Sequence, residues 1–461
     1  MMADSGIQGI QAIQDTQDIQ VRLRGALARI LDLTVNQRMS VIVDSPPGAG
    51  KTELIVSVVW VLALRKKLRV AVVAPRVSQV YDLCRRLGSV GPPLSIQVLL
   101  ASDRALPTDL SSNPVMLEPV SRARDIDPRA RVVVGTVSKF FSALPDFSAG
   151  EFELLCCEEA YMSAYKDLAP LLKLGRTVML VGDPGQLAPL VRVDTGPFES
   201  METKVHWAAP RQLRLSFPWV PVVSLPASRR LCRDTVSIVQ PAFYTSLPFV
   251  SAAPDATRRI SFSAPSSGDA IDRALDLSAE GASIVALLLP GREVSSGGVD
   301  LEVATLMAEV ATRVLARGAE WTGRRRIEPS HIGVMDAHVA GGASVRRALR
   351  ALDISTEEVL VDTPERFQGL ERLLTVVKHP MSGKRALSAF DLAADRWCVM
   401  LTRHLLCCLI IGREGIRETL EAHSHDCGER PLGAEDALWQ GWFTHSTLWA
   451  ELERLGRVVR M

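Results

Sequence analysis

The chain lacks an excess of charge of either sign. Its 461 residues include 53 lysines and arginines against 52 aspartates and glutamates, which gives a formal net charge of +1. This balance excludes a generally cationic surface, so a nucleic acid would have to bind in a local groove.

A long hydrophobic run is also missing. The longest apolar stretch, residues 54–64, is too short to span a bilayer. The N-terminus shows no basic segment followed by an apolar one, which is the pattern of a secretory signal. We therefore expect a cytoplasmic protein with no membrane partner.

Cysteine is scarce, and its eight residues do not suggest a disulfide scaffold. Two adjacent pairs, Cys156-Cys157 and Cys407-Cys408, stand in apolar runs typical of β-strands. Because neighbouring side chains of a strand point to opposite faces, we expect buried thiols, which suit a reducing compartment.

The composition, with 47% apolar and 23% charged residues, is that of a globular protein and excludes a disordered, collagen-like or coiled-coil chain. Short apolar runs alternate with helical patterns, which predicts an α/β fold with parallel strands covered on both faces. In the first half, residues 89–130 are expected to be irregular, helices are expected at 52–64 and 77–87, and strands at 40–43, 69–74, 131–134, 152–157 and 177–181. In the second half, a helix is expected at 301–315 and strands at 283–288, 332–335, 359–361, 374–377 and 405–411.

These patterns predict two α/β domains, residues 31–215 and 216–418, between two extensions. Residues 1–30 are a low-complexity extension in which Ile-Gln recurs, with a helical pattern from residue 18 onward. Residues 419–461 form a tail predicted to pack a helix on the body through Trp439, Trp442 and Trp449.

A phosphate-binding loop is predicted at residues 45–52, with the sequence SPPGAGKT between a strand and a helix. Backbone N–H groups of this loop and the helix N-terminus suit phosphate oxygens. Lys51 would reach the β- and γ-phosphates of ATP, and the Thr52 hydroxyl would bind Mg²⁺. The remaining residues expected to contact the nucleotide here are Pro47, Gly48, Ala49 and Gly50.

A P-loop ATPase also needs an acid at the end of a neighbouring strand. Residues 152–157 are an apolar run that ends in Glu158 and Glu159. We expect Glu158 to hold Mg²⁺ together with Thr52, and Glu159 to orient and deprotonate the attacking water.

At this point the motifs resemble those of superfamily 1 helicases, particularly the type B branch that includes the nonsense-mediated-decay RNA helicases. The resemblance covers roughly residues 31–415, and its most diagnostic string is GDPGQLAP at 182–189. It implies two tandem RecA-like domains, adenine contact by Gln37, and sensing of the γ-phosphate by Gln186. It also implies nucleic-acid contacts for Pro75, Arg76 and Thr136.

The second domain carries further strings that resemble this family. LPASRRL at 225–231 resembles the segment that supplies an arginine to the γ-phosphate, which gives Arg230 this role, with Arg229 as the alternative. VMLTR at 399–403 supplies Arg403 as a second such arginine, and the string at 362–371 supplies Thr363 for nucleic acid and Glu371 for the nucleotide.

The resemblance implies ATP hydrolysis coupled to 5′→3′ movement along single-stranded DNA or RNA, by a monomer. Tyr161, Phe367 and Trp397 are candidates to stack on bases, although core packing is the commoner role of such aromatic residues. Two other functions stay open: an ATP-driven switch that ignores nucleic acid, which the neutral net charge favours, and a binding scaffold without ATP turnover.

Overall fold

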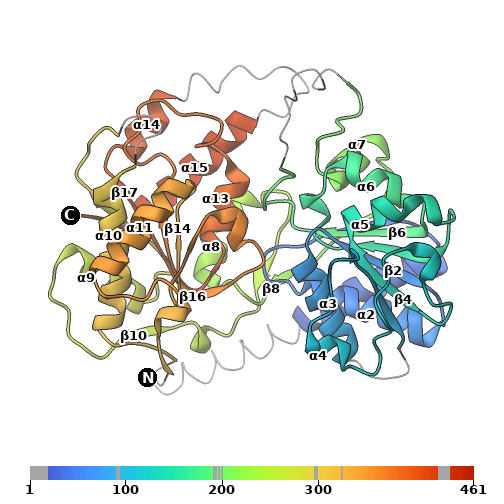
Figure 1. Cartoon of the computed structure of the whole chain (residues 1–461). Coiled ribbons are helices and arrows are strands. Elements are labelled where there is room, and N and C mark those ends of the chain that lie inside the picture. The colour runs from blue at the N-terminus through green and yellow to red at the C-terminus, as the bar shows by residue number, and fades with distance from the viewer. Residues whose placement is uncertain are drawn as a thin grey trace, which may run out of the picture. The chain divides into compact units, whose positions relative to one another are not determined.

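The computed structural model describes residues 19–89, 94–190, 195, 198, 201–294, 299–322, 325–423 and 437–461. The chain divides into two compact units, of which the first ends at Ala227 and the second begins at Ser228 (Figure 1). Residues 1–18 of the predicted N-terminal extension lie outside the described part. Residues 19–31 form a helix of the first unit, which packs Leu27 and Ile30 against the core.

Among the described residues of the first unit, seven strands form one parallel sheet in the order β3-β4-β2-β5-β6-β1-β7. The strands are β1 (Val41–Asp44), β2 (Val70–Ala74), β3 (Ile96–Leu99), β4 (Val132–Thr136), β5 (Phe152–Cys157), β6 (Gly175–Gly182) and β7 (Val222–Ser224). The predicted acid-bearing strand is therefore not the neighbour of the P-loop strand, because β6 lies between β5 and β1.

Helices cover both faces of this sheet, as the apolar strands require. On one face lie α2 (Lys51–Trp60) and α3 (Val77–Ser89), and on the other lie α5 (Val137–Ala143), α6 (Tyr165–Leu172) and α7 (Ala209–Ser216). A π-helical turn, η2 (Val61–Arg65), continues α2, and a further short helix is α4 (Thr108–Ser111). Cys156 joins the first core and Cys157 the second, as the alternation of a strand predicts.

The second unit repeats this plan with six described strands in the parallel order β15-β14-β16-β17-β11-β18. The strands are β11 (Ile284–Leu289), β14 (Ile332–Met335), β15 (Leu360–Asp362), β16 (Arg372–Lys378), β17 (His404–Arg413) and β18 (Val458–Arg460). Shorter strands are β8 (Ala227–Ser228), β9 (Val250–Ser251), β10 (Ile260–Phe262), β12 (Ala319–Trp321) and β13 (Arg325–Arg326).

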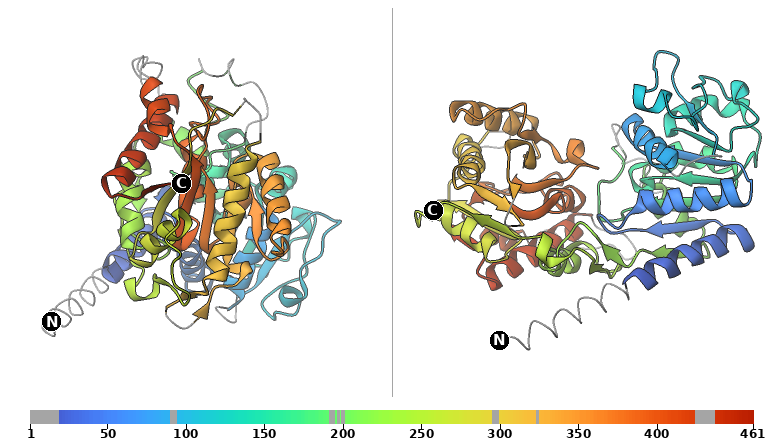
Figure 2. Two further views of the ribbon diagram at one scale, coloured as in Figure 1. Left: turned by 90° about the vertical axis from the view of Figure 1, so that its left-hand side faces the viewer. Right: turned by 90° about the horizontal axis from the view of Figure 1, so that it is seen from below.

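One face of this second sheet packs on α9 (Ala270–Ala279), α10 (Leu301–Ala316) and α11 (Val339–Ala351), and the other on α8 (Arg233–Phe243), α13 (Ala394–Leu401) and α15 (Ala437–Arg454). Figure 2 shows the yellow and orange helices of the first set and the red helices of the second on opposite sides of the strands. The remaining helices are α12 (Pro364–Phe367) and α14 (Ile416–Ala422).

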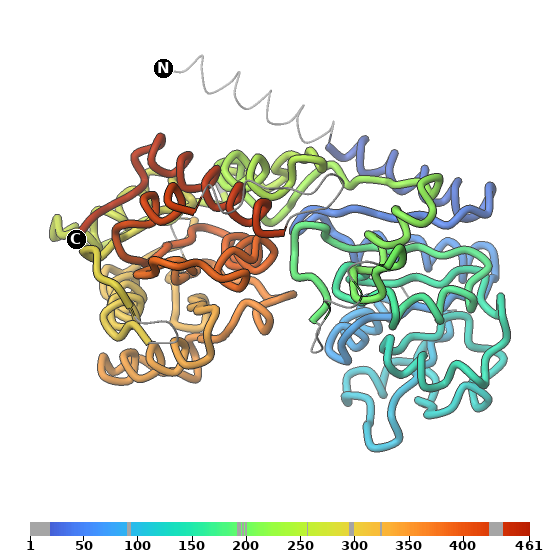
Figure 3. The backbone as a smooth tube through the Cα atoms, turned by 90° about the horizontal axis from the view of Figure 1, so that it is seen from above, coloured from blue at the N-terminus to red at the C-terminus, as the bar shows by residue number. Residues whose placement is uncertain are grey.

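The C-terminal residues are part of this unit's fold. Trp449 of α15 is buried in the core, and β18 adds a parallel strand beside β11 (Figure 3). The predicted aromatic packing is therefore present for Trp449. Within the described residues, no helix is both long and apolar enough to cross a membrane.

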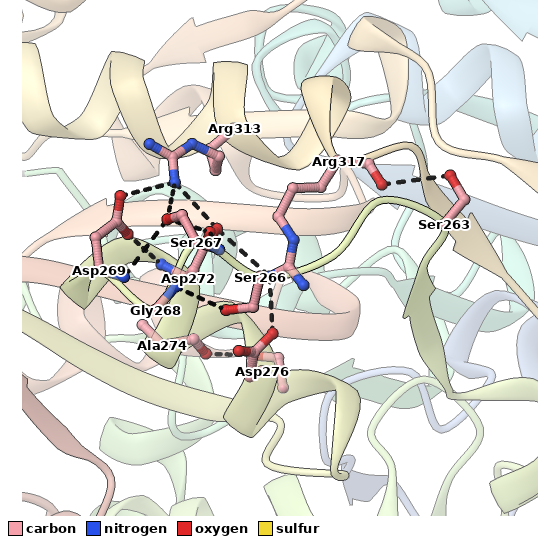
Figure 4. Close-up of polar contacts among 11 residues, drawn as sticks. Ser263, Ser266, Ser267, Gly268, Asp269, Asp272, Ala274, Asp276, Arg313 and Arg317 are labelled. Carbon is pink, nitrogen blue, oxygen red and sulfur yellow. Dashed lines mark hydrogen bonds and ion pairs between the residues drawn. The ribbon is translucent and has the colours of Figure 1, made fainter.

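An ion-pair network fixes α9 on α10 (Figure 4). Arg313 lies 2.9 Å from Asp269 and 3.1 Å from Asp272, while Arg317 lies 2.8 Å from Asp276 and 3.4 Å from Asp272. The Asp272 side chain is only 2% exposed, so both arginines compensate a buried carboxylate.

Candidate active site

The phosphate loop connects the end of β1 to the start of α2. Gly48 and Gly50 have φ values of 69° and 86°, a left-handed conformation that glycine adopts without steric cost. The turn is closed by the Ala49 N–H, which donates to the carbonyl of Pro46, and α2 begins at Lys51 directly after Gly50. This is the conformation that presents successive N–H groups and a helix N-terminus to an anion.

Two contacts join this loop to the acidic turn after β5. The Thr52 hydroxyl donates to Glu158 Oε1 at 2.7 Å, and Lys51 Nζ lies 3.2 Å from Glu159 Oε1. The four residues come from segments more than 100 positions apart. The structure thus brings together the predicted phosphate-binding, metal-binding and catalytic side chains of the first unit.

Glu158 is a buried carboxyl group, 6% exposed. Burial raises its pKa to about 7, and the neighbouring Glu159 adds to the rise, while the hydrogen bond from Thr52 and the charge of Lys51 oppose it. A hydroxyl and a carboxylate oxygen side by side are the hard oxygen donors that Mg²⁺ prefers, so the pair fits this ion. A cation held here would favour the ionised carboxylate.

Glu159 stands in a strained backbone conformation. Its φ of 48° and ψ of 44° place it in the left-handed region, which costs energy for a residue with a side chain. The turn persists because Met162 N–H donates to the Glu159 carbonyl, and Glu158 N–H donates to the Val73 carbonyl. Such strain is typical of residues whose side chain must take one direction for function.

The other predicted residues of the first unit follow neighbouring strand ends at the same edge of the sheet. Pro75 and Arg76 come directly after β2, and Thr136 ends β4, where its hydroxyl accepts the Lys139 N–H and caps α5. Residue 74 pairs with Thr136 in register, so these segments lie next to each other.

Gln186 and Gln37 both have local hydrogen-bond partners. Gln186 follows β6 and donates to the buried carboxylate of Asp183 at 2.6 Å. Gln37 is exposed, follows the π-helical turn η1 (Asp32–Asn36), and donates to Asp32 at 2.7 Å. Both residues lie in the first unit, but these contacts do not assign them a role.

The second unit gathers three of its predicted residues in one place. Arg230 donates to Glu371 Oε1 at 2.6 Å and to the carbonyl of Thr402 at 3.3 Å, beside Arg403, which is buried. Segments 225–231, 362–371 and 399–403 therefore converge. Thr363 lies at the N-terminus of α12.

The sequence did not indicate that Asp44, Tyr161 and Arg214 are linked at the end of β1, although it offered Tyr161 as a candidate for base stacking. The Tyr161 hydroxyl donates to Asp44 Oδ1 at 2.7 Å, and Arg214 of α7 pairs with the second oxygen of Asp44. The one signal in the sequence was an acid at the end of an apolar strand. Tyr161, Phe367 and Trp397 are all buried, so core packing and not base stacking describes these three aromatic residues.

Residues 10–182 match the family described as "Type III restriction enzyme, res subunit". This match covers less than half of the chain and indicates a helicase-family domain within it. The broad resemblance to ATP-dependent helicases, predicted from the motifs, is confirmed for this domain. The match contains the P-loop and the acidic turn at Glu158 and Glu159.

No curated protein matches the sequence of the chain. Among solved structures, the arterivirus nonstructural protein 10 helicase is 15% identical with a TM-score of 0.43, covering 85% of this chain and 61% of its own. The DUF1998 helicase MrfA bound to DNA and AMPPNP is 11% identical with a TM-score of 0.40, covering 88% of this chain and 52% of its own. The chain thus spans about three fifths or less of the length of these helicases.

Proposed function

We propose that the chain hydrolyses Mg²⁺-ATP and couples hydrolysis to movement along single-stranded nucleic acid. The observation that carries this proposal is the pair of contacts Thr52–Glu158 and Lys51–Glu159, which set a phosphate loop against two carboxylates. The helicase-family match over residues 10–182 supports the same activity.

Different residues of the first unit are proposed to bind the phosphates, to hold Mg²⁺ and to accept the proton of the attacking water. The N–H groups of residues 48–52 and Lys51 bind the phosphates, and Thr52 and Glu158 would hold Mg²⁺, which neutralises charge on the phosphate oxygens. Glu159 accepts a proton from the attacking water. In the structure its carboxylate pairs with Lys51, so we expect ATP to draw Lys51 away and release Glu159 for this role.

Two arginines of the second unit are proposed to take part in hydrolysis. A phosphoryl group in transfer spreads negative charge over its oxygens, and arginine supplies the countercharge. Arg230 and Arg403 are proposed for this role, with Gln186 as the sensor of the γ-phosphate and Gln37 as the adenine contact. Glu371, which holds Arg230 at 2.6 Å, would orient this arginine.

The nucleic-acid track is proposed to follow the strand ends of both units, through Pro75, Arg76, Thr136 and Thr363. Contacts to the sugar-phosphate backbone suit a chain that moves along any sequence. We further propose membership of superfamily 1, type B, with 5′→3′ movement of a cytoplasmic monomer. The seven described cysteines are buried and free, which suits a reducing compartment.

The test is the affinity of the wild type for fluorescent poly-dT and poly-U oligomers without nucleotide, with a non-hydrolysable ATP analogue, and with ADP. A translocase should bind one polymer with an affinity that depends on the bound nucleotide. Movement along the strand requires that the affinity for the polymer alternate during the ATP cycle. Lys51→Ala should abolish this dependence. Affinities that ignore the nucleotide, or absent binding in all three states, would favour the switch that acts without nucleic acid.

A further inference from the structure

One partly buried hydrogen-bonded network links the end of β1 to the turn after Glu159 and to α7. Its centre is Asp44, the last residue of β1 before the phosphate loop, whose side chain is 8% exposed. Tyr161 donates to one of its oxygens at 2.7 Å, and Arg214 pairs with the other. The carboxylate is therefore satisfied from two sides.

Tyr161 stands two residues after Glu159, in the short helical turn η5 (Ala160–Met162). Its hydroxyl reaches across to the P-loop strand, so the turn that carries the strained Glu159 is anchored at its far end by one hydrogen bond. A turn held in a costly backbone conformation needs such external contacts to persist.

The ring of Tyr161 also packs against Gly182, where the segment of Gln186 begins. A Cβ atom at Gly182 would lie 2.8 Å from Tyr161 Cδ2 and 3.1 Å from Tyr161 N, so only glycine leaves room for the ring. The Gly182 carbonyl in turn accepts the N–H of Ser45 at 3.0 Å. Tyr161 thus touches the ends of both β1 and β6.

We propose that Tyr161 is a positioning residue of the ATPase site, which fixes the Glu159 turn to the strand leading into the phosphate loop through Asp44. The proposal rests on the ATPase function proposed above. It deepens that function by naming a residue that acts through Glu159 and never touches ATP itself.

The experiment compares Tyr161→Phe with Tyr81→Phe, a matched loss of one hydroxyl in the same unit, where Tyr81 donates to the carbonyl of Ala105 at 3.1 Å. We expect kcat of Tyr161→Phe to fall about tenfold, because a small displacement of the base costs rate. KM for ATP and the Kd of a fluorescent ATP analogue should stay within about twofold, because the phosphate loop keeps its own contacts. Tyr81→Phe should match the wild type.

Two further variants test whether Tyr161 affects kcat through its contacts with Asp44 and Gly182. Gly182→Ala should lower kcat in the same way, since its Cβ displaces the Tyr161 ring. In a double-mutant cycle, Tyr161→Phe with Asp44→Ala should lose no more rate than Asp44→Ala alone, because Asp44→Ala already removes the hydrogen bond of Tyr161, together with the partner of Arg214. Thermal unfolding of each variant sets an assay temperature well below its midpoint.

Wild-type kcat in Tyr161→Phe would overturn the proposal while leaving the ATPase function intact. A fall in kcat matched by an equal loss of analogue binding would also overturn it, since that pattern indicates general disruption of the unit. Absence of any Lys51-dependent turnover in the wild type would instead refute the ATPase function itself, and this inference with it.

Discussion

Three buried histidines should make the second unit sensitive to mild acid. His379, His404 and His445 are each at most 1% exposed. Burial lowers the pKa of His404 and of His445 to about 3, and it lowers the pKa of His379 well below its usual value. Asp391, near His445, opposes this shift but does not overcome the desolvation.

The second unit loses stability in acid because the unfolded state binds protons at a higher pH than the folded state. An unfolded histidine titrates near pH 6.5, whereas the folded one stays neutral until about pH 3. Stability is therefore fully present above pH 6.5 and is lost as the pH falls toward the folded pKa. Between pH 7 and pH 5 the loss is about 2 kcal/mol per histidine, since each pKa unit is worth about 1.4 kcal/mol. This figure holds for any folded pKa below about 4. His404 and His445 together therefore give about 4 kcal/mol, and His379 adds to the loss in the same direction.

The variant His445→Phe isolates one of these contributions. The His445 ring stacks on Trp397 with 5.5 Å between centroids, and neither ring nitrogen has a hydrogen-bond partner among the described residues. Phenylalanine keeps the stack and loses no hydrogen bond. Its packing cost is the same at both pH values and cancels from the difference.

The assay is hydrogen exchange of peptides from α13 and α15, which report on the second unit alone. The free energy of opening should fall from pH 7 to pH 5 in the wild type, and it should fall by about 2 kcal/mol less in His445→Phe. An equal drop in the wild type and His445→Phe would refute the reasoning.

Three further predictions concern the ion pairs and the catalytic groups. Asp272→Asn should destabilise the second unit by about 3 kcal/mol in urea unfolding, because two arginines lose a buried charged partner. The control Asp276→Asn changes a carboxylate that is 37% exposed and should cost under about 1 kcal/mol. Equal costs of the two variants would contradict this prediction. Glu159→Gln should lower kcat by roughly 10²–10⁴-fold with ATP affinity nearly unchanged, and a wild-type rate would remove Glu159 as the base. Arg230→Ala should lower kcat by about 10³-fold or more and the exposed Arg229→Ala should not, whereas the reverse result would assign the finger to Arg229.

The strands that carry the site could be predicted from the sequence because each is a short buried apolar run. Residues 152–157 are β5 as predicted, and β1 and β2 differ from their predicted bounds by one residue. The approach of Thr52 to Glu158 could be proposed from the motifs, but their strands are not neighbours as predicted, because β6 lies between β5 and β1.

Other elements depend on contacts that no local pattern contains. Strand β3 lies inside the region expected to be irregular and has a polar residue, Gln97, at its centre. This side chain is buried because it donates to the Glu118 carbonyl and accepts the Asp127 N–H, more than 20 residues away. Strand β18 contains Arg460 and is recognisable only by its pairing with β11.

The same limit applies to the site. Lys51, Thr52 and Glu159 belong to short sequence motifs that by themselves indicate phosphate binding and water activation. Their roles could therefore be proposed from the sequence. Tyr161 and Arg214 act on Asp44 across 117 and 170 positions of the chain, so only the fold reveals them.

The central claim is that ATP hydrolysis at Lys51 and Glu159 responds to a single strand of nucleic acid. The most direct test is the initial rate of ATP hydrolysis without polymer, with poly-dT and with poly-U, for the wild type and Lys51→Ala. We expect a Lys51-dependent rate of ATP hydrolysis that rises steeply with at least one polymer. A Lys51-dependent rate that ignores both polymers, or no such rate at all, would contradict the central claim.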